Sequence, residues 1–453
     1  MTGGVGAERR LDRTAVRVWI GSALLAAFGI AQRLILWSTY TPVEYSDTGA
    51  YLRLGRVLAS GSLQSYDGRR VPGYPAFTAL AGGEAHSIYA LQLGLGVAIS
   101  LLVLWMTYRA TRSAGLGVLV GLLYDLIPGQ FLFEANLLSE TLTAFLMILS
   151  LTLLGELLRA VGRQIDAVWA LLLGICSALP GLTRPEYYFL PVWLIPFVVA
   201  GSAGLRQAAA RLLAFLLVPA LLLGGWVSFI YSRYGMLSPT VVVGYGLVQH
   251  TGPYFEDLPD SAAPLRDTYV RLRDERMAAR GDQTNTIWTA IPDLMKASGL
   301  GYYDLSRELQ RLSLQLIRTH PDRFALSAAE GWVDFWKAPV YAELEAIGSP
   351  PARAALRAWA LAGRALSLAA NAIFLMGSIG LAASRRVRRR LDVDPHVLAA
   401  AGTVWITSIL QTLVEHGDNP RFLMPTQMLV FYVVARWAYA WWRGSRQREA
   451  APA

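Results

Sequence analysis

The 453-residue chain is 54% hydrophobic and only 16% charged, with a mean hydropathy of +0.38. Soluble domains average about 25% charged residues, so the composition excludes an ordinary soluble domain and predicts an all-α, polytopic membrane protein. The formal net charge is +9. Its basic residues stand in short clusters between apolar runs, as the positive-inside rule predicts, so we expect contact with a lipid bilayer and not with nucleic acid. A single cysteine, Cys176, excludes an intramolecular disulfide.

The chain opens with an arginine-rich flank followed by an apolar run over about residues 16–38. About 20 apolar residues cross a hydrocarbon core about 30 Å thick. The run is too long for the h-region of a signal peptide and no small-residue cleavage site follows it. We therefore expect a retained span with a cytoplasmic N-terminus.

A polar loop over residues 39–86 follows the first span. Within it, Tyr51, Leu54 and Leu58 recur at helical spacing after Asp47, and Gly61 is a plausible helix end. The pattern predicts a short helix along the membrane surface. Asp47 falls in its first turn, where the helix dipole favours a carboxylate.

Further apolar runs predict about ten spans in all, which places both termini on the cytoplasmic side of a plasma membrane. The later runs cover about residues 87–108, 116–133, 137–158, 167–182, 187–199, 212–231, 361–383, 397–413 and 422–442. We expect a transmembrane module over 1–231, an external helical cap over 232–352 and C-terminal transmembrane helices over 353–453. In the cap, Leu305, Leu309, Leu312 and Leu316 share one helix face.

This topology gathers polar residues from separate loops at one outer face. They are Glu44, Asp47, Asp67, Arg69, Arg70, Glu134, Asn136, Glu140, Arg184, Glu186, His250, His416, Asp418 and Arg421. Loops that meet on rigid spans commonly build a site. The simpler alternatives are that Asp47 only caps its helix and that the loop arginines contact solvent or lipid head groups.

Other common chemistries find no support in the sequence. His250 and His416 lack the close spacing of a metal site. We find no Gly-rich phosphate loop, nucleophile elbow or metalloprotease helix. These observations disfavour a nucleotide-dependent or a soluble hydrolytic mechanism.

Several short motifs, in order, resemble the GT-C superfamily of polyprenyl-phosphate-sugar-dependent glycosyltransferases. Asp47-x3-Tyr51 and Arg70-Val71-Pro72-Gly73-Tyr74-Pro75 resemble the first external loop of that superfamily, particularly in the branch of protein O-mannosyltransferases and lipid A aminoarabinose transferases. Further matches are Leu138-Ser139-Glu140, Thr183-Arg184-Pro185, His320-Pro321 and the segment from Glu415 to Pro425 with Arg421-Phe422. The resemblance covers most of the chain.

The resemblance implies a sugar donor on a polyprenyl phosphate, an extracytoplasmic active site and inversion at the anomeric carbon. It also implies that an acidic residue of the first external loop acts as the general base, a role that falls on Asp47. Many members carry a second acidic residue directly after the first, whereas here Thr48 follows and Glu44 precedes. That departure leaves open whether Asp47 or Glu44 is the base and whether a divalent cation is needed.

The chemistry of such a transfer suggests which side chains serve it. A leaving phosphate needs cations, and guanidinium matches phosphate bidentately, which favours Arg70, Arg184 and Arg421. Arg69, Tyr74, Glu140 and His416 complete the candidate donor-binding set. The acceptor hydroxyl belongs to a glycan, a lipid or a protein. The alternatives are a transporter or flippase of lipid-linked sugars, and a polysaccharide ligase or polymerase.

Overall fold

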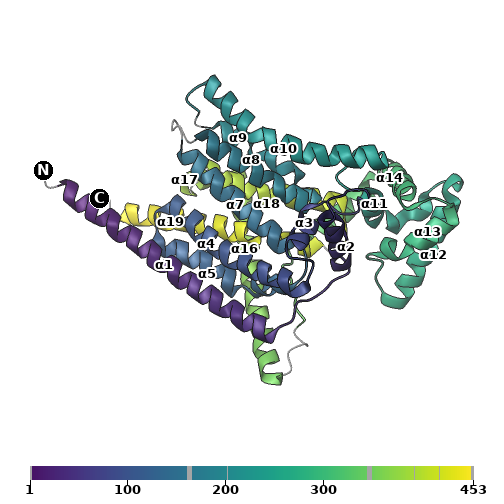
Figure 1. Cartoon of the computed structure of the whole chain (residues 1–453), viewed down its shortest axis with the longest axis horizontal. Coiled ribbons are helices and arrows are strands. Elements are labelled where there is room, and N and C mark those ends of the chain that lie inside the picture. The colour runs from purple at the N-terminus through teal and green to yellow at the C-terminus, as the bar shows by residue number, and fades with distance from the viewer. Residues whose placement is uncertain are drawn as a thin grey trace.

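The computed structural model describes residues 3–160, 166–200, 202–343, 349–391, 393–417 and 419–449, with side chains from residue 15 to residue 446. Within these ranges the regular structure is helical, apart from one isolated parallel bridge between Val43 and Asn136. Long apolar helices form a bundle, and a group of shorter helices gathers at one end of it (Figure 1). The chain is therefore all-α, as its composition predicts.

Seven described helices are long and apolar enough to cross a membrane. They are α1 (Gly3–Thr39, apolar from Ala15), α4 (Ala85–Thr111), α7 (Glu140–Arg159), α8 (Asp166–Thr183), α10 (Leu205–Tyr234), α16 (Pro350–Ala383) and α18 (Pro395–Val414). An eighth span exists if α5 (Ala114–Leu126) is joined to the segment Pro128–Ala135, which holds α6 (Pro128–Phe131) and η1 (Leu132–Ala135). The chain is thus a multi-pass membrane protein with seven or eight candidate spans.

The expectation of about ten spans is too high for the described residues, for three local reasons. The run at 116–133 bends by 63° because Ile127 precedes a proline and leaves the α region. The run at 187–199 holds η2 (Pro185–Phe189) and α9 (Leu190–Val199), and the ten residues of α9 rise only about 15 Å. The run at 422–442 holds η6 (Asn419–Thr426) and α19 (Gln427–Glu449), whose tyrosines, tryptophans and arginines lower its hydropathy.

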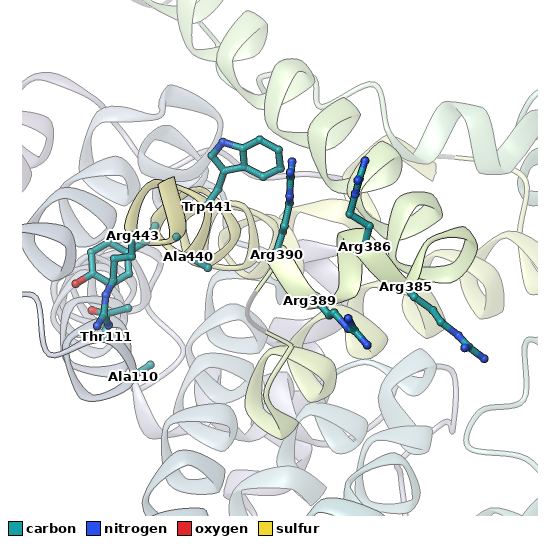
Figure 2. A pocket seen from close by; sticks show the side chains of 11 residues that line it. Ala110, Thr111, Arg385, Arg386, Arg389, Arg390, Ala440, Trp441 and Arg443 are labelled. Carbon is teal, nitrogen blue, oxygen red and sulfur yellow. The ribbon is translucent and has the colours of Figure 1, made fainter. Parts of the chain in front are cut away.

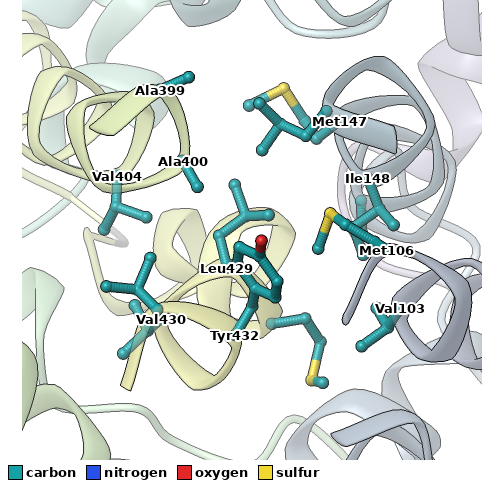
Figure 3. Packing of buried hydrophobic residues seen from close by; sticks show 14 of the residues in the cluster. Val103, Met106, Met147, Ile148, Ala399, Ala400, Val404, Leu429, Val430 and Tyr432 are labelled. Atoms are coloured by element: carbon teal, nitrogen blue, oxygen red, sulfur yellow. The ribbon is translucent and has the colours of Figure 1, made fainter. Parts of the chain in front are cut away.

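The core of the bundle lies where α4, α7, α18 and α19 meet. Met147 and Ile148 of α7 face Val404 of α18 and Leu429 of α19, and all four are fully buried (Figure 3). Small residues let the helices approach closely, since a Cβ added at Gly174 of α8 would lie 2.1 Å from the carbonyl oxygen of Phe215 in α10. This packing fixes the ends of the spans from which the polar loops emerge.

The section after α10 is helical, as expected. It contains α11 (Val243–Thr251), η3 (Gly252–Asp257), η4 (Asp260–Ala262), α12 (Ala263–Arg280), α13 (Thr286–Ser298), α14 (Tyr302–Thr319) and α15 (Pro321–Phe335). The predicted apolar face of α14 is confirmed, because Leu305, Leu309, Leu312 and Leu316 are buried. Figure 1 shows α11 to α14 at the end of the bundle opposite the two termini.

The first loop contains two helices, α2 (Thr48–Ala59) and α3 (Gly73–Leu80), which lie between the bundle and the α11–α14 group (Figure 1). The Pro-Gly-Tyr-Pro sequence fits this place for a steric reason. A Cβ at Gly73 would lie 2.6 Å from the carbonyl oxygen of Leu182, at the end of α8. The glycine therefore lets the loop approach the segment that carries Arg184.

A buried ion-pair cluster anchors α1 to the bent segment. Arg33, only 4% exposed, donates to Glu134 over 2.8 Å and 2.6 Å and to Asp125 over 2.9 Å. The position of Glu134 in the sequence predicts a place in the outer polar group, whereas the structure pairs it with Arg33, which no sequence pattern singles out. The pairing arises because α1, α5 and η1 pack together, which no local pattern reveals.

We expect Arg33→Leu to destabilise the protein by about 3–5 kcal/mol, because it leaves two buried carboxylates without their cation. The measurement is the thermal unfolding midpoint of the purified protein in detergent. Arg53→Leu is the matched control, since Arg53 is 51% exposed in its pair with Asp67 and exposed pairs contribute about 1 kcal/mol or less. Equal losses in the two variants would contradict the assignment.

Candidate functional site

Asp47 stands at the N-cap position of α2 but makes no capping hydrogen bond with its side chain. One carboxylate oxygen, Oδ1, accepts a 2.5 Å hydrogen bond from Nη2 of Arg70. The other, Oδ2, accepts a 3.2 Å hydrogen bond from Nη2 of Arg421. The simpler alternative, in which Asp47 caps α2, is therefore wrong. The carboxylate points instead toward two guanidinium groups from distant segments.

Arg421 of η6 carries the contacts on to a second carboxylate. Its Nε lies 2.7 Å from Oε1 of Glu140, the first residue of α7. The same Glu140 oxygen lies 2.6 Å from Nη1 of Arg184, which follows α8. Arg184 also donates from Nε to Glu186 over 2.5 Å and from Nη1 to Ser139 over 3.2 Å.

These contacts form one continuous network, which we call the ion-pair chain. It consists, in order, of Arg70, Asp47, Arg421, Glu140, Arg184 and Glu186. Three guanidinium groups and three carboxylates balance its formal charge. The members come from the first loop, the start of α7, the end of α8 and the segment before α19, so helix packing alone brings them together.

Solvent access changes along the ion-pair chain. The side chains of Glu140 and Arg184 are 0% and 5% exposed, whereas those of Asp47 and Arg70 are 18% and 29% exposed. The Asp47 end is therefore partly exposed, while the Glu140 end is enclosed by protein. The enclosed end is suited to hold Arg421 in place.

The charge state of Asp47 follows from its partners. Burial raises the pKa of its carboxyl, but the attraction and hydrogen bonds of Arg70 and Arg421 outweigh burial and lower the pKa to about 2. Glu415, just after α18, shows the opposite: burial raises its pKa, although Arg421 and a hydrogen bond from Gln249 act against the rise. Two neighbouring carboxyls pushed apart in pKa are typical of acid–base sites.

Aromatic rings support the arginines. The guanidinium carbon of Arg70 lies 5.9 Å from the ring centre of buried Tyr51. Tyr74 packs edge-on against Tyr51 at 4.8 Å and donates its hydroxyl to Gln92 over 2.7 Å. Tyr74 is thus one layer behind the ion-pair chain. On the other side, the ring of Phe422 lies 4.7 Å from the guanidinium carbon of Arg184.

Three other candidates lie away from the ion-pair chain. Glu44 is exposed and forms no ion pair within the described ranges. Arg69 stacks on the ring of Tyr302 at 3.8 Å and lies 3.8 Å from Asp67. His416 contacts Ser327 over 2.7 Å and lines a cavity of about 260 Å³. Asp418 lies outside the described residues.

Several residues around the site carry contacts that the sequence patterns do not predict. Glu415 and Phe422 belong to the motif segment from Glu415 to Pro425, but the motif predicts no contact for either, and no pattern singles out Gln249 or Ser327. A carboxylate directly after an apolar span, as Glu415 is, gives one usable signal, because burying it is costly without partners. The other three carry no local signal, since their contacts depend on how the cap meets the loop before α19.

Within the described ranges, no group of three or more His, Cys, Asp or Glu residues is arranged to hold a metal ion. The carboxylates of the ion-pair chain bind arginines instead.

Neither a protein-family model nor a curated protein sequence matches this chain. Among solved structures, it is similar to the archaeal oligosaccharyltransferase AglB from Archaeoglobus fulgidus, solved with an inhibitory peptide and a dolichol-phosphate. The identity is 12%, the TM-score 0.48, and the match covers 96% of this chain and 52% of AglB. This chain thus spans about half the length of that protein.

A second similar structure is ArnT from Cupriavidus metallidurans bound to undecaprenyl phosphate. The identity is 14%, the TM-score 0.39, and the match covers 90% of this chain and 77% of ArnT. Scores of this size assign no activity to this chain.

We expect acidification below about pH 6.5 to destabilise the cap. Burial, and then nearby His416, lowers the pKa of His250 to about 3, while an unfolded histidine titrates near about 6.5. The unfolded state therefore binds the proton first, and between pH 8 and pH 5 the loss is roughly 2 kcal/mol. The measurement is the unfolding midpoint against pH.

His250→Gln is the matched variant, because an amide keeps a hydrogen bond to Ser327 and does not titrate. Its unfolding midpoint should fall less between pH 8 and pH 5 than that of the unaltered protein. Asp47 does not interfere, since its pKa of about 2 lies far below this window. Identical pH profiles would refute the role of His250.

Proposed function

We propose that this chain is an integral-membrane glycosyltransferase that moves a sugar from a polyprenyl phosphate to an acceptor hydroxyl on the extracytoplasmic side, with inversion. The observation that carries the proposal is the ionised Asp47 carboxylate held between Arg70 and Arg421 at the accessible end of the ion-pair chain. The proposed base, Asp47, accepts one hydrogen bond from each of the two proposed phosphate-binding groups, Arg70 and Arg421. The proposal places both termini on the cytoplasmic side of the plasma membrane.

The reaction requires one proton transfer and one substitution. The acceptor hydroxyl gives its proton to the Asp47 carboxylate, and the acceptor oxygen bonds to the anomeric carbon. The bond from that carbon to the phosphate oxygen breaks, and the electron pair leaves with the polyprenyl phosphate. Attack opposite the leaving phosphate inverts the anomeric configuration. A well-placed base typically contributes about 10²–10⁴-fold.

The arginines serve the leaving group and also set the strength of the base. Guanidinium groups bind a phosphate bidentately and stabilise its developing charge. When a phosphate takes over a hydrogen bond of Arg70 or Arg421, Asp47 loses part of the attraction that lowers its pKa. The pKa of the carboxyl then rises toward its usual range. Asp47 becomes a stronger base when the donor phosphate is in place.

Glu140 and Arg184 act as positioning residues in this proposal. Both are buried, and Glu140 contacts Arg184 and Arg421 through the same oxygen. A guanidinium held by a fixed carboxylate loses little freedom when it binds phosphate, which is the advantage of preorganisation. The pair therefore fixes Arg421 toward Asp47.

The isoprenoid tail of the donor needs apolar surface next to the site. The apolar stretches of α1, α10 and α16 are each only 22% buried inside the protein. Their exposed sides contain large apolar residues, such as Leu34 and Ile35 near the end of α1 that leads into the first loop. These helix surfaces support a substrate that is drawn from the bilayer.

We expect Asp47→Asn to reduce transfer by about 10²–10⁴-fold, because the amide cannot accept the proton. The measurement is transfer from a panel of radiolabelled polyprenyl-phosphate sugars by the detergent-purified protein, with an unfolding midpoint to verify the fold. Glu44→Gln, which removes an exposed carboxylate of the same loop, should keep nearly full activity. Turnover retained in Asp47→Asn, or lost in Glu44→Gln, would assign the base elsewhere.

We expect Arg421→Lys to lower turnover by about 10²-fold or more, since removing one preorganised donor has that typical effect. An ammonium keeps the charge but cannot bind Asp47 and Glu140 with the geometry of a planar guanidinium. Arg69→Lys is the control for position, because Arg69 lies outside the ion-pair chain on Tyr302. Similar kcat/KM values in the two variants would count against a specific role for Arg421.

A further inference from the structure

An open pocket of about 960 Å³ lies between α17 (Arg385–Arg390), the end of α19 and the end of α4. Five arginines line it: Arg385, Arg386, Arg389 and Arg390 from α17, and Arg443 from α19. Figure 2 shows Arg443 beside Thr111 on one side of the pocket and the α17 arginines on the other. We call this the arginine pocket.

The arginine pocket is far from the ion-pair chain. Arg421 lies in η6, the segment that directly precedes α19, whereas Arg443 lies toward the other end of the 23-residue helix α19. A helix of this length rises about 35 Å. The two sites therefore lie at opposite ends of the bundle, and the arginine pocket lies near the two termini (Figure 1).

The five pocket arginines differ from their neighbours in having no carboxylate partner among the described residues. On two helices that border the pocket, Arg109 of α4 pairs with Glu156 over 2.6 Å, and Arg436 of α19 pairs with Asp394 over 2.8 Å. Five positive charges around one hollow repel each other. An anion bound in the pocket offsets this repulsion, and guanidinium groups in this number suit phosphate oxygens.

The surroundings of the pocket favour a lipid as the source of that phosphate. The guanidinium carbon of Arg390 lies 4.9 Å from the ring centre of Trp441, and that of Arg443 lies 5.8 Å from Tyr439. Tryptophan and tyrosine concentrate at head-group depth. Met376 and Ile379, in the last turns of α16 before α17 begins at Arg385, are each 63% exposed. Acyl chains can cover this apolar surface while the head group enters the pocket.

We propose that the arginine pocket binds the phosphate of an anionic phospholipid at the membrane surface opposite the ion-pair chain. Simple positive-inside placement of arginines requires no pocket and no preference among anions. Binding of one head group requires a pocket and a preference for that anion, because several guanidinium groups must contact the same phosphate. It does not depend on the transferase activity proposed above.

The test measures binding of phosphatidylglycerol and of phosphatidylcholine to the full-length, detergent-purified protein by native mass spectrometry. We expect at least about tenfold tighter binding of phosphatidylglycerol, and loss of most of this preference in Arg389→Gln/Arg443→Gln. Arg17→Gln/Arg206→Gln removes two exposed arginines outside the pocket and should keep the preference.

The remaining outcomes separate the pocket from general electrostatics. Equal binding of the two lipids, or an equal loss of preference in both double variants, would overturn the proposal. Displacement of phosphatidylglycerol by millimolar inorganic phosphate would identify a soluble anion as the ligand and overturn the lipid assignment. If Arg389→Gln/Arg443→Gln fails to fold, Arg389→Lys/Arg443→Lys keeps the charge, loses the bidentate geometry and should show a weaker preference.

Discussion

The interaction on which the candidate site depends is the sharing of one guanidinium group between two carboxylates. Arg421 contacts Asp47, 374 positions earlier in the sequence, and also Glu140 at the start of α7. Neither contact forms unless η6, α7 and the first loop are held against each other. The close approach of Gly73 to the end of α8 and the core packing between α7, α18 and α19 provide that restraint.

The contribution of buried ion pairs to folding stability does not by itself account for such a network. Buried ion pairs often contribute no more to folding than apolar residues of the same size, because each charge must first be taken out of water. The Arg33 cluster and the Glu140 end of the ion-pair chain are both enclosed, yet only the latter leads to an accessible carboxylate. Asp47 and Glu415 also differ in the direction of their pKa shifts. The change from enclosed charges at Glu140 to partly exposed charges at Asp47 supports the substrate-binding role proposed above.

The arginines at the two ends of the bundle differ in whether they have carboxylate partners. At the end near the cap, Arg70, Arg184 and Arg421 each contact a carboxylate, so a phosphate must compete with those partners. At the other end, the pocket arginines have no carboxylate partner among the described residues. In the functions proposed above, competition suits a donor that must enter and leave the site, whereas unopposed positive charge suits a lipid that stays bound. The helices α4 and α19 reach both ends.

The sequence alone determined the features that depend on composition and on local periodicity. These are the membrane class, the helix after Asp47, the helical section after α10 and the buried face of α14, because each follows from residues close together in the chain. Asp47, Arg70, Arg184 and Arg421 could be named from motif resemblance, but not paired. Only the tertiary structure decided that Asp47 contacts arginines instead of capping α2, that Glu134 binds Arg33, that Glu44 and His416 lie apart, and that there are fewer spans than expected. The physical reason is that the partner of a charge, and its cost of burial, are set by helices packed from distant parts of the chain.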